Sequence, residues 1–281
     1  MEFANYGSFR KAILSNLNEY NLYGRGYYPR TKQYYDHIAS LPNNATTEEK
    51  LALIQRIIAD DGVAPDLFIK PHKDAHHLNS SQVVCYEFFR PMITVQKRAN
   101  SLLLSFLNSI GLPSEEFSAG YGEFEWEPNN EEQTNFDFYV QQSRPIPETV
   151  LTDKAIYFEI KYTESEFGAE PINDRRREKY DSIYTQMIDN CVCLKRRPSI
   201  EEYFKSYQLF RNTIRLTKDN WQNEYVVFLF PRENKAVLDE YRIFEEHFIL
   251  EQYRNHIKAV YWEDLVESMS DRFREKFFPY L

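Results

Sequence analysis

The stretches that decide the fold read Thr134-Asn-Phe-Asp-Phe-Tyr-Val140 and Ala155-Ile-Tyr-Phe-Glu-Ile-Lys-Tyr-Thr163. Each alternates apolar and polar residues, which is the pattern of a β-strand with one buried face. The apolar faces consist of Phe136, Phe138 and Val140, then Ile156, Phe158, Ile160 and Tyr162. The opposite faces consist of Asn135, Asp137 and Tyr139, then Tyr157, Glu159, Lys161 and Thr163. If the strands pair as a hairpin through the Pro-containing loop at 144–153, Asp137 and Glu159 lie side by side, with Lys161 on the same face.

The sequence around these two strands indicates a sheet with flanking helices. A further strand precedes them, in the alternating stretch 123–127, and a buried strand follows at 225–230, closed by Pro231. Helical spacing covers 173–193, 199–217, 234–253 and the region from 263, with a short strand at 258–262. Ser199 and Glu202 form a capping-box pattern at the start of the second of these helices. Three consecutive strands predict an antiparallel meander, and strands reached through helices can pair in parallel.

The N-terminal part of the chain is predicted to be helical. Helical spacing covers 8–19 and 30–41, and a capping-box pattern at Thr46 and Glu49 opens a helix that runs to about Ala59. The segment 79–111 is strongly helical, with Pro91 dividing it into two helices. We therefore predict an α/β fold, a mixed β-sheet flanked by helices. A helical N-terminal extension is expected over 1–75, and the core over 76–281.

The composition is that of a folded protein rather than a disordered or membrane protein. The chain has 281 residues, of which 42% are hydrophobic and 16% aromatic, enough for a packed core. No apolar run approaches the roughly 20 residues that span a bilayer. The N-terminus lacks the pattern of a signal peptide, so we expect a cytoplasmic protein with no membrane association. The three cysteines form no CxxC motif and are expected to be buried structural thiols.

The net charge of −9 argues against a broad basic surface that coats nucleic acid. The segment 170–220 nevertheless holds eleven Lys and Arg against eight Asp and Glu, a local excess of three positive charges. Ordinary solvated helix faces would also account for this excess. The loop 23–30, aromatic and basic with two glycines, has the same two readings: a nucleic-acid contact or a packed turn. His76 and His77 have no matching Cys/His pair at zinc spacing, which argues against a zinc site.

The residues Asp137, Glu159 and Lys161 suit phosphodiester hydrolysis. Two carboxylates can hold Mg²⁺, which prefers oxygen ligands, and the backbone at Glu159–Ile160 can add a carbonyl oxygen to the metal shell. The metal polarises the phosphate and lowers the pKa of a bound water. The lysine can orient or help deprotonate that water and stabilise the developing charge. Spacing alone does not decide the point, because a solvated strand face commonly carries Glu-x-Lys.

The stretch that ends in Asp137, together with Phe158-Glu159-Ile160-Lys161-Tyr-Thr-Glu164, resembles the signature of the PD-(D/E)XK nuclease superfamily. The order of helix, three strands, helix and strand over roughly 80–230 is also similar to the core of that family. The sequence departs from the pattern in having Phe136 where a proline often precedes the aspartate. The resemblance implies Asp137 and Glu159 as ligands of Mg²⁺ or Mn²⁺, with Lys161 positioning the nucleophilic water. It implies a DNA endonuclease of the restriction or defence type that leaves 5′-phosphate and 3′-hydroxyl ends.

Several residues are second candidates for the same site. Family members often place an additional metal-binding Glu on the helix before the sheet, where Glu87 lies; the alternative is an exposed pair with Arg90. Gln82 could reach the site or belong to the start of its helix. The segment Tyr207-Gln208-Leu-Phe-Arg211-Asn212 resembles helical segments of restriction-endonuclease-like proteins, so Gln208 and Arg211 are candidate substrate contacts, with surface pairing as the alternative. Glu125 and Glu127 could join the acidic cluster, although a solvated strand edge is the favoured interpretation.

The sequence leaves other functions and partners open. The alternative to a nuclease is a catalytically silent nucleic-acid-binding or assembly module that retains the fold, for which the acidic net charge is the supporting feature. A third alternative is a structural protein whose strand faces are merely solvated. DNA is the expected partner, with RNA not excluded. A homodimer is also open, because enzymes that cut both strands often work as dimers with twofold symmetry.

Overall fold

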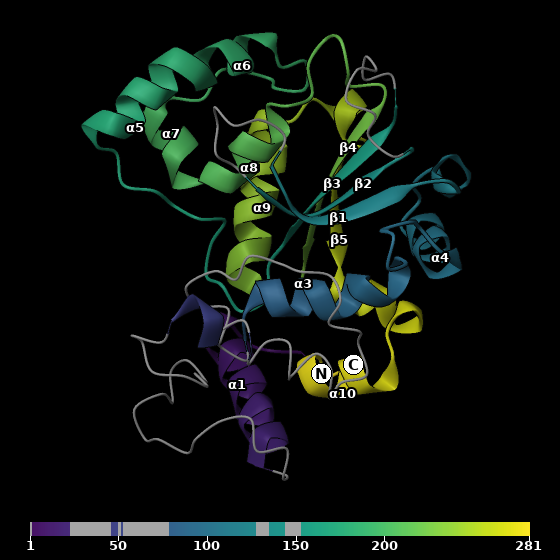
Figure 1. Cartoon of the computed structure of the whole chain (residues 1–281). Helices are drawn as coiled ribbons and strands as arrows, with labels where there is room; N and C mark the ends of the chain where they lie inside the picture. The colour runs from purple at the N-terminus through teal and green to yellow at the C-terminus, as the bar shows by residue number, and fades with distance from the viewer. Residues whose placement is uncertain (1, 23–45, 50–51, 53–78, 128–134, 144–152) are drawn as a thin grey trace.

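The computed structural model describes residues 2–22, 46–49, 52, 79–127, 135–143 and 153–281. Its centre is a five-stranded sheet in the order β1-β2-β3-β4-β5. The strands are β1 (Tyr121–Trp126), β2 (Phe136–Gln141), β3 (Ala155–Ile160), β4 (Glu224–Phe230) and β5 (Ile257–Tyr261). The first three pair antiparallel, and β4 and β5 join in parallel. The predicted mixed sheet of a meander followed by parallel strands is therefore confirmed (Figure 1).

One face of the sheet, called here the α3 face, carries Phe138, Val140, Ile156, Phe158, Ile160, Val227 and Leu229. It packs against α3 (Ser81–Phe89), α4 (Ser101–Ser109) and α10 (Asp271–Phe277), and α1 (Tyr6–Leu22) joins the same core. The contacts are largely aromatic: the Phe89 ring stacks on Phe138 with 4.2 Å between centroids, and Phe88 meets Trp262 edge-on at 4.9 Å. Because α1 shares this core, the N-terminal helix supports the sheet-bearing part of the chain.

The opposite face, called here the α8 face, carries Tyr139, Tyr157, Val226, Phe228 and Phe230. It is covered by α7 (Ile200–Lys205), α8 (Tyr207–Thr213) and α9 (Lys235–Phe248). A helical arm precedes α7 and consists of α5 (Asp174–Lys179), a π-helical turn (Tyr180–Tyr184) and α6 (Thr185–Asn190). Figure 1 shows this arm at the outer edge of the molecule, beyond α8. The sheet is thus enclosed between two helical layers.

The faces of β2 differ from the alternation read in the sequence. Phe138 and Val140 lie on the α3 face as predicted, but Phe136 belongs to the α8 face, where its ring lies 4.7 Å from that of Tyr157. The intervening residue explains the change. The Asp137 carboxylate accepts a hydrogen bond from the backbone N–H of Ile160 on β3, at 2.6 Å. With a side chain occupying this ladder position, β2 does not alternate regularly through Asp137.

Several predicted helices are divided in the structure. The segment 79–111 changes to a 3-10 turn at Arg90–Met92, where Pro91 cannot supply a helical N–H, and α4 restarts with the Asn100 side chain as its cap. The segment 199–217 breaks at Ser206, between α7 and α8. The helix expected from 263 begins as a 3-10 turn, Trp262–Ser268, before α10. Strand β3 ends at Ile160 rather than Thr163, because the Glu164 carboxylate captures the backbone N–H of Tyr162 at 2.6 Å.

The two predicted capping boxes are both present. At α7 the Ser199 hydroxyl accepts from the N–H of Glu202 while the Glu202 carboxylate accepts from the N–H of Ser199. Thr46 and Glu49 make the same reciprocal pair at 3.2 and 2.7 Å, and residues 47–49 are helical. The loop 23–30, the helix predicted at 30–41, His76, His77 and the expected boundary between 75 and 76 lie outside the described residues.

The cysteines lie in two places. Cys85 on α3 and Cys193 are buried, while Cys191 is half-buried, and all three are free thiols. Cys191 follows α6 in extended backbone, and its sulfur atom lies 3.0 Å from that of Cys193. Within the described ranges, no helix is long and apolar enough to cross a membrane.

Candidate active site

The antiparallel register of β2 and β3 brings two carboxylates together. The register ends at the pair Phe138 and Phe158, and Asp137 and Glu159 are the next residues along the two strands, near enough for the charge of Glu159 to raise the pKa of Asp137. The N–H of Ile160 holds one oxygen of Asp137 at 2.6 Å. The three residues of the predicted site therefore come from adjoining strands, with Lys161 one residue beyond the end of β3.

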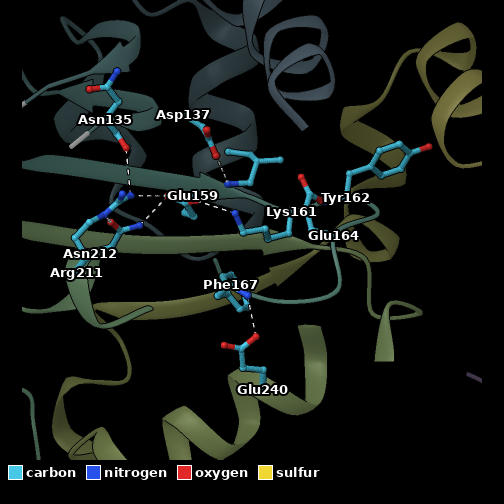
Figure 2. Close-up of polar contacts among 11 residues, drawn as sticks. Asn135, Asp137, Glu159, Lys161, Tyr162, Glu164, Phe167, Arg211, Asn212 and Glu240 are labelled. Carbon is cyan, nitrogen blue, oxygen red and sulfur yellow. Dashed lines mark hydrogen bonds and ion pairs between the residues drawn. The ribbon is translucent and has the colours of Figure 1, made fainter. Parts of the chain in front are cut away.

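Glu159 is buried and held from three directions. Lys161 Nζ lies 3.0 Å from its Oε1, and Asn212 Nδ2 donates to its Oε2 at 2.8 Å. Arg211 NH2 approaches the same Oε2 at 3.4 Å (Figure 2). Arg211 also donates to the backbone oxygen of Asn135 at 3.3 Å, just before β2. Helix α8 thus ties the beginning of β2 to the acidic end of β3.

Lys161 is positioned by the chain that follows β3. Its Nζ lies 5.8 Å from the centre of the Phe167 ring, and Phe167 packs edge-on against Phe228 and Phe230 of β4. The N–H of Phe167 donates to Glu240 Oε2 on α9 at 2.8 Å, as drawn in Figure 2. The carbonyl of Lys161 accepts a hydrogen bond from the Trp262 indole at 3.4 Å. Contacts to both helical layers therefore fix the lysine at the end of the strand.

The surroundings move the pKa values of the two carboxylates in opposite directions. Burial raises the pKa of Asp137 well above its ordinary value, and the charges of Glu159 and Glu125 add to this, against Lys161 and the Ile160 N–H. Burial would also raise the pKa of Glu159, but Lys161 and Arg211, with the hydrogen bonds from Lys161 and Asn212, hold it below its ordinary value. Neighbouring carboxylates whose pKa values are shifted in opposite directions are typical of catalytic sites.

Lys161 is a cation in these surroundings. Burial by itself would lower its pKa, but Glu159, Glu164 and Asp137 raise it above its ordinary value. The ammonium group therefore serves as a hydrogen-bond donor and a positive charge. It suits orientation of a water molecule and stabilisation of charge on a phosphate more directly than it suits proton abstraction.

Glu125 lies beside Asp137 on the other side of β2. Phe124 pairs with Phe138 and Trp126 with Phe136, so Glu125 is opposite Asp137 in the β1–β2 register. Its backbone φ is 52°, in the left-handed region that non-glycine residues rarely adopt. The Gln82 amide on α3 donates to Glu125 Oε1 at 2.7 Å. Glu125 thus lies on the edge strand, half-buried and hydrogen-bonded, and its charge acts on Asp137, whereas Glu127 is exposed, as expected of a solvated strand edge.

The other candidate residues lie at different distances from this group. Gln82 reaches it through Glu125, and the Ser80 cap position makes no side-chain hydrogen bond, so Gln82 is not part of a capping box. Arg211 lies in the group, on Glu159. Gln208 instead packs beside Gly168, whose φ is 69°, and its backbone N–H donates to Phe167.

Glu87 is oriented toward α10. Its carboxylate forms a buried ion pair with Lys276 Nζ at 2.7 Å, with both side chains at most 3% exposed. The alternative of an exposed pair with Arg90 was wrong, since Arg90 is also buried and donates to the carbonyl of Ile93 at 2.9 Å.

Sequence reasoning did not identify Asn212 as part of the site. Its side chain is fully buried and makes the shortest described hydrogen bond to Glu159. Asn212 was visible only as the last residue of the segment that begins at Tyr207. Asn212 is uncharged and lies 53 residues after Glu159, so no sequence motif links the two.

The donor set fits a hard divalent cation. The adjoining oxygens of Asp137 and Glu159, with a backbone carbonyl at Ile160, are the ligand type that Mg²⁺ takes, and Mg²⁺ usually keeps several waters. Burial, and after it repulsion from Glu159 and Glu125, raises the pKa of Asp137, and a bound cation would relieve that repulsion. Among the residues that the structure describes, no group of three or more His, Cys, Asp or Glu side chains is arranged to hold a metal ion. The set is therefore a two-carboxylate site rather than a closed protein cage.

Comparison with known proteins gives one match. A family model described as "Restriction Endonuclease associating with ARP" matches residues 16–277. The match spans all five strands of the sheet and all the candidate site residues. No curated protein matches the chain, and no solved structure matches it.

Proposed function

Because the chain belongs to the REase-ARP family of PD-(D/E)XK-type restriction endonucleases, we propose that it hydrolyses phosphodiester bonds of DNA with Mg²⁺ or Mn²⁺ at Asp137, Glu159 and Lys161. The observation that carries the proposal is the Lys161 ammonium, 3.0 Å from Glu159 and next to a second carboxylate. A solvated strand face would not bury these charges. Lys161 and Glu159 are only 6% and 2% exposed.

In the proposed reaction, Asp137 and Glu159, with the Ile160 carbonyl, hold the divalent cation. When bound, the cation would polarise the phosphate and lower the pKa of a coordinated water. Lys161 donates hydrogen bonds to the attacking water and to a phosphate oxygen as negative charge grows there. Arg211 and Asn212 keep Glu159 ionised and correctly oriented, which prepares the carboxylate as a ligand.

The test is cleavage of mixed circular and linear DNA by the purified protein with Mg²⁺, Mn²⁺ or EDTA. The wild type is expected to cut with metal only. Lys161→Ala and Glu159→Ala should fold and lose cleavage by about 10²–10³-fold or more, the usual cost of removing a transition-state donor. Lys154→Ala is the matched control, because this lysine immediately precedes β3 but pairs with Glu116 at 2.6 Å, outside the candidate site. Full activity in Lys161→Ala would overturn the assignment.

Metal binding is measured separately by calorimetry. Asp137→Asn should bind Mn²⁺ much more weakly than the wild type, because the amide has lost one of the two charged ligands. Unchanged Mn²⁺ affinity would remove Asp137 from the proposed metal site while leaving the cleavage test intact.

A second candidate function is a DNA-binding or assembly module that does not cut. One observation favours it: Lys161, Arg211 and Asn212 already engage both oxygens of Glu159 within the protein. Such a module would bind DNA in a salt-dependent way without metal-dependent cleavage. The same cleavage assay, run beside a DNA titration, separates the two functions.

A further inference from the structure

A continuous series of side chains leads from the candidate active site to the helical arm. Arg211, on Glu159, lies with its guanidinium carbon 5.4 Å from the centre of the Tyr207 ring. The Tyr207 hydroxyl is 2.6 Å from the Tyr184 hydroxyl. The Tyr184 ring in turn lies 5.4 Å from the ammonium group of Lys179, the last residue of α5. Two cations are thus linked through Tyr207 and Tyr184. The first, Arg211, lies beside the carboxylates, and the second, Lys179, lies on the arm.

The π-helical turn fixes the base of the arm. Tyr180 and Tyr184, at its two ends, both pack on Tyr203 of α7, with ring centroids 5.2 and 5.0 Å apart. The Tyr180 hydroxyl also donates to the carbonyl of Pro198 at 3.1 Å. Helix α5 beyond this anchor has no buried residue. The protein therefore holds a polar helix at a defined place beyond α8, linked to the active site through Tyr184 and Tyr207, and π-turns are frequent at functional sites.

The exposed helix carries positive charge toward Arg211. Burial lowers the pKa of Lys179, and the charges of Arg211 and Arg175 lower it further, so the three cations act on one region. Arg176, the neighbouring arginine, is instead engaged by Glu170 and by the carbonyl of Pro171. Bringing like charges together is unfavourable unless an anion is present. The convergence occurs in a chain whose net charge is −9.

The spacing of the cations suits a polyanion better than a single small anion. Arg175 and Lys179 are four residues apart on one helix, which separates them by about 6 Å along its axis. A DNA strand carries one phosphate per about 3.4 Å of duplex axis, so this separation spans about two phosphates. The tyrosine rings beside Lys179 and Arg211 restrict where each cation lies, which favours a defined path for a backbone over diffuse attraction.

We propose that Arg175, Lys179 and Arg211 form a phosphate track that holds the sugar–phosphate backbone of DNA next to the bond to be cut. The proposal rests on the proposed function for its position beside a cleavage site. The track contacts backbone and not base edges, so it contributes affinity and register and not sequence choice. Arg211 belongs both to the track and to the support of Glu159, which makes Arg175 and Lys179 the residues to test.

The experiment is a titration of a short mixed-sequence DNA duplex in EDTA at several salt concentrations, followed by fluorescence anisotropy. The double variant Arg175→Gln/Lys179→Gln should bind more weakly at low salt. The slope of log affinity against log salt should fall by about 1 for each lost phosphate contact, or about 2 in all. The matched control is Arg196→Gln/Arg197→Gln, which removes the same charge from arginines that pair with Glu202 and Asp189. It should leave the slope unchanged.

Unchanged affinity and slope in the Arg175/Lys179 variant would overturn the track. So would an equal loss in the control, because the effect would then be one of net charge. Since EDTA prevents cleavage, the result does not depend on catalysis. Failure of the proposed function would show as a wild type that does not cut DNA with Mg²⁺ or Mn²⁺, whatever the salt slopes are.

Discussion

At the scale of single residues, the charge of a buried carboxylate depends on the balance between burial and its hydrogen-bonding and cationic partners. Glu159 is held below its ordinary pKa by Lys161 and Arg211, while burial raises the pKa of the adjacent Asp137. The same contrast recurs at the other end of the α8 face. There burial raises the pKa of Glu224 to about 7, in spite of a hydrogen bond from the Tyr157 hydroxyl at 3.1 Å and the charge of Arg215. Proximity to a cation is thus not enough to keep a buried carboxylate ionised.

Glu224 is expected to make stability fall as the pH rises. The unfolded chain ionises this residue near its ordinary value of 4.5, whereas the folded protein keeps it protonated to about 7. Unfolding therefore releases a proton in this window, and the free energy of unfolding decreases from pH 4.5 to 7 and then levels off. The loss is at most about 3 kcal/mol, from 1.36 kcal/mol per pKa unit. Urea unfolding of wild type and Glu224→Gln across this range measures it, and the variant should lack this part of the slope.

A second carboxylate serves as the control for that slope. Glu202 is held at a pKa of about 2 by Arg196 and the Ser199 N–H, so it is ionised in both states above pH 5 or so. Glu202→Gln should weaken the helix cap and lower stability by a constant amount from about pH 5 to 7, and so leave the slope over that range as in the wild type. An unaltered slope in Glu224→Gln would show that another group titrates in this window.

At the scale of elements, local sequence patterns predicted the strands and helix starts that depend only on residues close together in the sequence. Alternation identified β1, β2 and β3, and a continuous apolar run identified β4. The Ser199–Glu202 pattern identified the start of α7, since a capping box uses groups three residues apart. The patterns failed where distant groups intervene. The Asp137–Ile160 hydrogen bond breaks the alternation of β2, and the π-turn at Tyr180–Tyr184 depends on packing against α7.

The candidate site shows the same division. The shared face of Glu159 and Lys161 follows from the alternation read in 155–163, because the face of a strand is a local property, whereas Asp137 interrupts the alternation of β2 by accepting the Ile160 N–H. Asn212 reaches Glu159 only when α8 packs on the sheet, and the positive φ of Glu125 has no signature in a glutamate. Glu87 was assigned to the metal by its helix, but the direction of its side chain depends on α10, which lies almost two hundred residues later. Its role at the metal stays a prediction.

The cap of α7 gives a prediction at this scale. Ser199→Ala removes the hydroxyl that accepts from the Glu202 N–H at 3.1 Å, and should lower the free energy of unfolding by about 1 kcal/mol. Ser199→Gly is the matched variant, and should cost only a few tenths of a kcal/mol because glycine is tolerated at this position. Urea denaturation measures both. Equal stabilities for the alanine and wild-type proteins would mean that the capping box contributes nothing here.

At the scale of the whole molecule, α10 joins the two ends of the α3 face. Lys276 pairs with Glu87 of α3, and the Tyr162 hydroxyl, one residue beyond Lys161, donates to the carbonyl of Phe277 at 2.5 Å. Asn16 of α1 donates to the carbonyls of Glu275 and Lys276 at 3.1 and 2.8 Å. Figure 1 shows α10 beside α1 and below α3. The segment that positions Lys161 is therefore supported by a helix far away in the sequence.

The buried pair between Glu87 and Lys276 should be strongly coupled. Lys276→Met alone leaves the Glu87 charge buried, and should cost about 3–5 kcal/mol of unfolding free energy. Glu87→Leu/Lys276→Met removes both charges and should recover most of that loss, since a hydrophobic replacement of a buried pair is often neutral or stabilising. Chemical denaturation of the two single variants and the double variant completes the cycle. Simple addition of the single losses would contradict the coupling.

The position of α10 has a consequence for the order of events during synthesis. Residues 271–277 leave the ribosome after all five strands, yet they supply Lys276 to Glu87 and the Phe277 carbonyl to Tyr162. A nascent chain that has already produced Glu159 and Lys161 thus lacks the support behind them. The hydrogen bond that anchors Tyr162, next to Lys161, can therefore form only after the whole sheet has been synthesised.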